Sequence, residues 1–187
     1  MPTLIHVTKF YGIKDARLTP MTADPPGGTA TYGTSIDVPG IKSALVTGNV
    51  VTKKLRGDSA PIDQDSYLES ISVKFTYAQE SLNVRAAAVG GTTTDSGTTP
   101  NQLARWRLLG TDPLFPYYKF EGLANGVGLG LGDGHLVLWK CKTSSFPAMG
   151  FAEEDYQIYE ITAEVFPRAA DSFWIDELLN ETAVAIS

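Results

Sequence analysis

A glycine-rich run, GVGLGLGDG at 126–134, is the stretch of this chain that most resembles a site for chemistry. A dinucleotide-binding fingerprint needs glycines at relative positions 1, 3 and 6, at the start of a helix. Counted from Gly126, Gly128 and Gly130, the sixth position is Leu131, Asp133 and His135, respectively, and never glycine. The run also lacks a P-loop lysine, and the strand-like HLVLWKCK follows it instead of a helix. It therefore predicts a hairpin connection in which glycines supply positive φ angles.

The side chains best suited to metal binding or nucleophilic catalysis are scattered. His6 and His135 lie far apart in the sequence, and neither has a His or Cys at ligand spacing. We expect His135 to be half-exposed at the start of a strand. The single cysteine, Cys141, alternates with Val137 and Trp139 on an apolar face, which predicts a buried, unreactive thiol. We therefore predict no catalytic, cofactor-binding or metal-binding residue, and no enzyme.

Composition and charge narrow the class of protein further. A chain of 187 residues suits one domain with a sizeable core. A net charge of −6 disfavours diffuse binding to nucleic acid, and one cysteine excludes an internal disulfide. No apolar run approaches the roughly 18 residues that indicate a membrane span, and the N-terminus does not resemble a signal peptide.

A period of two dominates the hydrophobic pattern and predicts a mainly β fold. In ESISVKFTY, Ile71, Val73, Phe75 and Tyr77 share one face and polar residues share the other. The same pattern, or a short apolar run between turns, predicts further strands at 16–22, 41–48, 103–109, 117–122, 135–143, 159–165 and 173–179. Short strands separated by turns are typical of an antiparallel two-sheet sandwich or barrel.

One short helix, at about 78–89, interrupts the strands. Thr76 and Gln79 fit a capping box, and Gly90 suits a left-handed end. We expect a narrow apolar stripe of Leu82, Ala86 and Val89 to pack on the flank of a sheet.

Turn-rich segments at 22–34 and 90–102 are expected to be surface loops. A longer loop is expected at 49–68, where its length inside a compact domain indicates either disorder or contact with a partner. It carries Lys53, Lys54, Arg56, Asp58, Asp63 and Asp65. We see no linker, so we expect a single domain over 1–187, with an N-terminal arm at 1–14 and a C-terminal arm at 180–187.

Taken in order, several segments resemble the major tail tube proteins of long-tailed (siphovirus-type) bacteriophages. They are GIKDARLTPMTAD, YGTSIDVPGIKSA, KKLRGDS, LESISVKFTYAQESL followed by GG, PYYKFEG, VLWKCKTSSFPAMGFAEEDYQIYEITAE and NETA. The similarity extends over nearly the whole chain. It implies a β-sandwich with a flanking helix that assembles into hexameric rings, stacked into a tube through which DNA leaves the virion without specific binding.

The resemblance also implies partners and a location. The partners are other copies of the chain, the tape measure protein and the tail terminator; the location is the virion tail, and the host cytoplasm during assembly. No catalytic residue or cofactor is implied. For such a tube, we expect residues 53–65 to mediate ring stacking. Glu121, Glu160 and Glu164, on strand faces opposite apolar ones, are expected to line an acidic lumen.

Two other functions remain open from the sequence. One is another tube-related part, either a head–tail completion protein or a relative of secretion tubes. The other is a carbohydrate- or peptide-binding β-sandwich with an aromatic platform. That platform would comprise Trp106, Trp139, Trp174, Tyr117 and Tyr118. Because alternation puts Trp106 and Trp139 on apolar faces, these rings are expected to fill the core and its interfaces instead.

Overall fold

The structure, a computed structural model, describes residues 9–56, 58, 61–127, 132–150, 156–180 and 182–186. The expected mainly β, antiparallel fold with one helix is confirmed. In chain order the elements are β1 (Lys9–Ala23), β2 (Thr31–Tyr32), β3 (Ile36–Asp37), β4 (Ile41–Arg56), β5 (Pro61–Tyr77), α1 (Leu82–Val89), β6 (Thr92–Ser96), β7 (Leu103–Arg107), β8 (Tyr118–Val127), β9 (Asp133–Thr143), β10 (Tyr159–Val165) and β11 (Ile175–Asn180).

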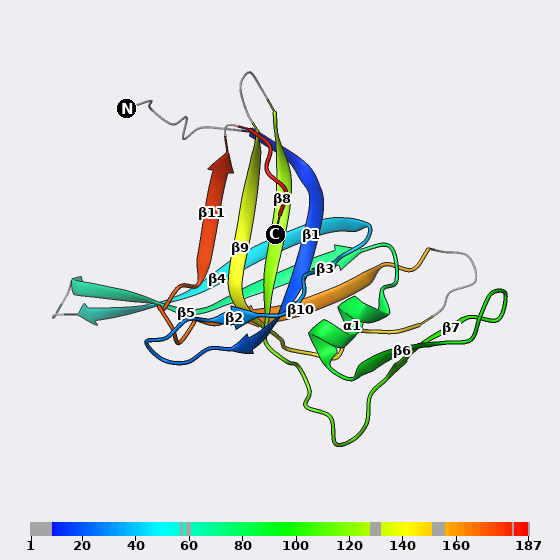
Figure 1. Cartoon of the computed structure of the whole chain (residues 1–187). Coiled ribbons are helices and arrows are strands. Elements are labelled where there is room, and N and C mark those ends of the chain that lie inside the picture. The colour runs from blue at the N-terminus through cyan, green and yellow to red at the C-terminus, as the bar shows by residue number, and fades with distance from the viewer. Residues whose placement is uncertain are drawn as a thin grey trace.

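Nine of the strands form one antiparallel sheet that folds over on itself. Its main path runs β2-β1-β8-β9-β10-β5-β4, and β6 and β7 form a separate two-stranded sheet. Along one edge β9 pairs with β8, while its other edge pairs first with β11 and then with β10. In Figure 1 the β1, β8, β9 and β11 half of the sheet crosses the β10, β5 and β4 half, as in a sandwich.

The core lies between these two halves, on the faces that period-two alternation predicts. Phe75 of β5 meets Phe120 of β8 with ring centroids 5.0 Å apart. Tyr118 is fully buried beside them, and its hydroxyl lies 3.2 Å from Oγ1 of Thr143. Because a buried phenolate would lose its hydration, burial raises the pKa of Tyr118.

The helix begins later than the sequence predicts. Ser81, not Thr76, caps α1, because its hydroxyl accepts a hydrogen bond from the Val84 N–H at 3.4 Å. The buried face also differs from the expected stripe: it comprises Val84, Ala87, Ala88 and Val89. The helix ends as expected at Gly90, which has a φ of 105° and donates its N–H to the Ala86 carbonyl.

Two of the expected loops are strands. Most of the segment 49–68 is not a loop: residues 49–56 extend β4 and residues 61–68 extend β5 into a long pair of strands, with Lys53 opposite Asp65. Within 90–102, Thr92–Ser96 forms β6 and pairs with β7. The polar residues of both segments hid these strands, because every residue of β6 and nearly every described residue of the outer β4–β5 hairpin is exposed, so burial imposes no apolar alternation on them.

The two expected arms and the glycine run are only partly described. Residues 1–8, including His6, and the residues 128–131 lie outside the described part of the chain. The remainder of the N-terminal arm belongs to β1. Asn125 pairs with Asp133 across β8 and β9, so the glycine run does connect a hairpin.

Two glycines with positive φ angles, Gly12 and Gly90, give a stability test. A Cβ on Gly90 would lie 2.5 Å from the Pro113 carbonyl oxygen, whereas a Cβ on Gly12 (φ 64°) meets nothing within 4 Å. We expect Gly12→Ala to cost about 1 kcal/mol of unfolding free energy, for its positive φ alone. Gly90→Ala adds a backbone clash and is expected to cost more than about 2 kcal/mol.

Urea denaturation measures both losses. Gly110→Ala is the control, because Gly110 has neither a positive φ nor a neighbour within 4 Å of the added Cβ, so its change should stay within about 0.5 kcal/mol. Equal losses for the Gly12 and Gly90 variants would contradict the clash at Gly90.

Candidate self-assembly surfaces

The outer half of the β4–β5 hairpin, residues 49–56 and 61–69, projects from the body of the molecule (Figure 1). We call this part the distal ribbon. Of its described side chains, all but that of Val51 are exposed. Several are large and apolar: Ile62 is 70% exposed, and Leu55 is 63% exposed. An isolated two-stranded ribbon is marginally stable in water, and exposed apolar side chains of this size are typical of contact surfaces.

Strand register separates the distal ribbon into two faces. One, the aspartate face, comprises Val51, Lys53, Leu55, Asp63, Asp65 and Tyr67. The opposite face comprises Val50, Thr52, Lys54, Ile62, Gln64, Ser66 and Leu68. The Lys53 ammonium lies 5.7 Å from the centroid of the Tyr67 ring, so it crosses to the neighbouring strand of the same face.

The six residues expected to mediate ring stacking all lie in this hairpin. Five belong to its strands and Asp58 lies between them, and all six are exposed. The structure therefore gathers these charges on a projecting ribbon with defined faces.

The free edge of the main sheet is a second candidate surface for self-assembly. β4 is the last strand of the sheet path, and no other described strand pairs with its outer edge. Such an edge leaves backbone N–H and C=O groups available to another strand. The free edge of β1, in contrast, is partly covered by β2 and β3.

The outer face of β10, β5 and β4 is rich in hydroxyl groups and carries two of the three expected lumen residues. Glu160 and Glu164 are both exposed there. The Lys74 ammonium lies 2.8 Å from Oε2 of Glu160. Ser43 and Thr76 share a hydrogen bond of 2.7 Å on the same face. This face is polar.

The third expected lumen residue, Glu121, is buried. Its side chain is 7% exposed, and the Lys119 ammonium lies 2.8 Å from Oε2 of Glu121. The expectation is wrong for this residue because β8 lies between β1 and β9, and the outer face around Lys119 is covered by the rings of Tyr32 and Trp139. Alternation along one strand does not reveal that both of its faces are covered.

The C-terminal segment, residues 182–186, lies along β9 and β8 (Figure 1) and is fastened by Asp133. The Asp133 carboxylate accepts hydrogen bonds from the Val184 N–H at 2.6 Å and from the Asn180 amide at 2.8 Å. Nε2 of His135 lies 3.0 Å from the Val184 carbonyl oxygen, so it carries the proton and donates it. Ile186 is 3% exposed. Residues 182–186 of the expected C-terminal arm therefore pack on their own chain.

This docking corrects the expectation for His135. The side chain is 8% exposed, not half-exposed, because β11 pairs alongside β9 and the C-terminal segment crosses over it. Cys141 is fully buried as expected, and burial raises the pKa of its thiol.

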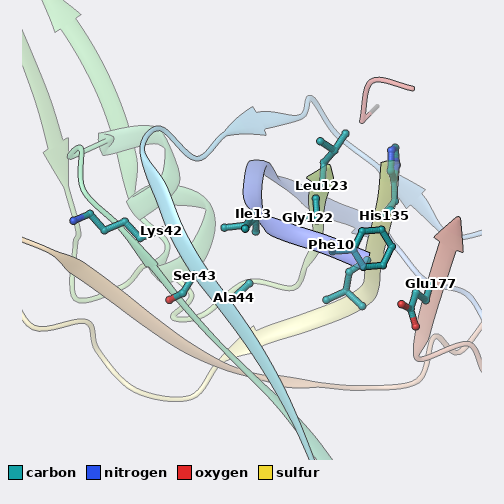
Figure 2. Close-up of a pocket in the computed structure, with 13 residues that line it drawn as sticks. Phe10, Ile13, Lys42, Ser43, Ala44, Gly122, Leu123, His135 and Glu177 are labelled. Atoms are coloured by element: carbon teal, nitrogen blue, oxygen red, sulfur yellow. The ribbon is translucent and has the colours of Figure 1, made fainter. Parts of the chain in front are cut away.

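A hollow of about 390 Å³ lies between the first residues of β1, β4 and β9 and the middle of β8 (Figure 2). Phe10, Ile13, Ala44 and Leu136 make its lining mainly apolar. Figure 2 shows Lys42 and Glu177 on opposite sides of the hollow, without a convergent set of polar groups. The hollow therefore provides apolar space and no constellation for acid–base or nucleophilic chemistry.

The aromatic residues of the alternative carbohydrate-binding function do not form a platform. Tyr118 is in the core, and Trp174 packs against the core. Trp106 donates its indole N–H to the Gly90 carbonyl at 2.9 Å. Trp139 donates to Asp176 at 2.8 Å. Tyr117 is the most open of the five, with its ring beside Lys140, and the three tryptophans are half-buried; the five rings come from separate places in the fold.

The Asp133 fastening gives a pH-dependent test. Burial alone would raise the pKa of Asp133, but hydrogen bonds from Asn180, Val184 and His135 outweigh it and lower that pKa. A lowered folded-state pKa means that the carboxylate stabilises the fold above its unfolded pKa of about 3.9, and that this contribution is lost as the pH falls further.

We expect Asp133→Asn to cost about 1.5–3 kcal/mol of unfolding free energy at neutral pH, where one amide hydrogen would oppose the Val184 N–H. The difference from wild type should shrink below about pH 4. Urea denaturation between pH 2 and pH 7 measures it, and Asp95→Asn, at an exposed position in β6, is the matched control. A difference that stays constant across this pH range would exclude the charge of Asp133 as the cause.

No protein-family model matches the chain, and no curated protein sequence matches it. Among the described residues, no three His, Cys, Asp or Glu side chains gather as a metal site. Over the same residues, no helix has both the length and the apolar character needed to span a bilayer. The function must therefore be argued from the surfaces described above.

Proposed function

We propose that this protein is a structural subunit that assembles with copies of itself into stacked rings, as the tail tube of a long-tailed bacteriophage. The observation that carries the proposal is the distal ribbon, which projects from the body with both faces exposed. A feature with little support from its own chain gains stability when it packs on another copy. The role is structural rather than enzymatic.

Three further features support the proposal. The free edge of β4 provides a margin on which a neighbouring copy can continue the sheet. The resemblance to tail tube proteins covers segments along nearly the whole sequence in matching order. The hydroxyl-rich face with Glu160 and Glu164 suits a lumen, because a polar surface with negative charges would repel the phosphates of passing DNA and prevent sticking.

The proposal includes partners and a location. The main partner is a second copy of the chain, first within a ring and then between rings. The tape measure protein and the tail terminator are the other proposed partners, in the virion tail and, before that, in the host cytoplasm. DNA passes through the tube without sequence-specific contacts.

Assembly of the purified protein tests the proposal directly. Negative-stain electron microscopy over a concentration series should show tubes of uniform width. Assembly that stops at a single ring would instead favour a head–tail completion protein. A chain that stays monomeric up to the highest soluble concentration would exclude a self-assembling tube subunit.

A shortened hairpin tests the role of the distal ribbon. Asn49 and Ser70 face each other across β4 and β5, so a two-residue Asn-Gly turn can replace residues 50–69. We expect a folded protein, because the removed residues lie outside the core, that forms no tubes. Circular dichroism checks the fold and electron microscopy checks assembly; unchanged tubes would contradict the role of the ribbon.

A further inference from the structure

The β6–β7 ribbon has one face against the protein and one face toward solvent. Its inner face carries Trp106, whose indole N–H donates to the Gly90 carbonyl, and Thr93, whose hydroxyl donates to the Asn83 side chain of α1 at 3.0 Å. By strand register, the outer face comprises Thr92, Thr94, Ser96, Leu103, Arg105 and Arg107, all of them exposed. Its charged groups are therefore the two guanidinium groups.

These two arginines are exposed like charges, and neither has an ionic partner among the described residues. Among the described residues, the ion pairs within 4 Å involve Arg85 and Arg168 but neither Arg105 nor Arg107. They lie two positions apart on β7, so their side chains leave the same face about 6.7 Å apart. A partner that carries two negative charges at that spacing would match them.

The aspartate face of the distal ribbon has that arrangement. Asp63 and Asp65 lie two positions apart on β5, and Tyr67 follows two positions later on the same face. Both carboxylates are exposed, and Tyr67 is 48% exposed. Neither carboxylate is in an ion pair within 4 Å with another described residue.

When β7 and β5 are laid face to face in antiparallel directions, the two patterns coincide. Arg107 then meets Asp63, and Arg105 meets Asp65. The next position along pairs Leu103, which is 49% exposed, with Tyr67. The spacing is therefore complementary at three successive positions, two of them ionic and one apolar.

The two faces cannot meet within one molecule. Figure 1 shows the distal ribbon and the β6–β7 ribbon projecting on opposite sides of the body. A contact between them must join two copies head to tail. Such a heterologous contact leaves one ribbon of each kind free for the next copy, so it closes into a ring or continues as a filament.

We infer that the outer face of the β6–β7 ribbon receives the aspartate face of the distal ribbon of a second copy, with Arg105 on Asp65, Arg107 on Asp63 and Leu103 on Tyr67. This inference rests on the proposed self-assembly and identifies the surfaces that it uses. The one cation of the aspartate face, Lys53, is held over the Tyr67 ring and reduces the net negative charge that the arginines meet.

Charge reversal tests the pairing. One variant carries Arg105→Glu and Arg107→Glu; a second carries Asp63→Lys and Asp65→Lys. All four positions are exposed, so both proteins are expected to fold, with circular dichroism as the check. Because each variant places like charges opposite each other, we expect its critical concentration for assembly to rise at least about tenfold.

The decisive measurement is an equimolar mixture of the two variants. In an alternating arrangement every contact again pairs opposite charges, so the mixture should assemble at a concentration close to that of wild type. The protein with all four substitutions should do the same. As matched control, Asp95→Lys reverses an exposed charge on the other face of the β6–β7 ribbon, outside the proposed contact, and should change the critical concentration less than about twofold.

The outcomes separate the inference from the proposed function. If wild type forms tubes and the variants also assemble normally, or if neither the mixture nor the fourfold variant is rescued, the pairing is overturned and the tube function stands. If wild type forms no assembly at any concentration, both are overturned. Failure of each variant alone together with rescue in the mixture supports the pairing.

Discussion

The backbone hydrogen bonds of β9 are the constraint on which the rest of the structure depends. One edge of β9 pairs with β8, and the other pairs with β11 over its first half and with β10 near its end. Because two strands share one edge, the sheet diverges there, and the β10, β5 and β4 half crosses over the β8 and β1 half. Phe75 and Phe120 are brought together by this crossing, and the core closes around Tyr118.

The same crossing determines which margins remain open. β1 is partly covered by β2 and β3, and the C-terminal segment is fastened along β9 through Asp133. β4 remains at the end of the sheet, and the hairpin continues from it beyond the core as the distal ribbon. In a monomer, an uncovered strand edge next to an exposed ribbon favours aggregation. In an assembly, the same edge allows another copy to pair with it. This contrast is the physical basis of the proposed self-assembly.

Charged side chains have different surroundings in the body of the protein and on its two ribbons. Lys119 and Glu121 are buried together as a pair, and the carboxylate of Asp24 is held by Lys140 and by the Ala169 and Ala170 N–H groups. Burying a charged group without such partners would reduce the free energy of unfolding. In contrast, the aspartate face of the distal ribbon carries two spaced carboxylates in solvent, and the outer face of the β6–β7 ribbon carries two spaced guanidinium groups. When two like charges on one copy face two opposite charges on another, the contact sets the register and direction of assembly more than its affinity.

The sequence by itself determined the fold class, most of the core strands and the burial of Cys141, because each strand that faces the core must alternate apolar and polar residues. For 49–68, the length of the segment left disorder and contact with a partner as alternatives. Only the tertiary structure decided that this segment is a ribbon, that Thr92–Ser96 is a strand, and that Glu121 and His135 are buried. A ribbon without a buried face leaves no apolar period, and the covering of a strand depends on segments distant in the sequence, such as the C-terminal residues over His135.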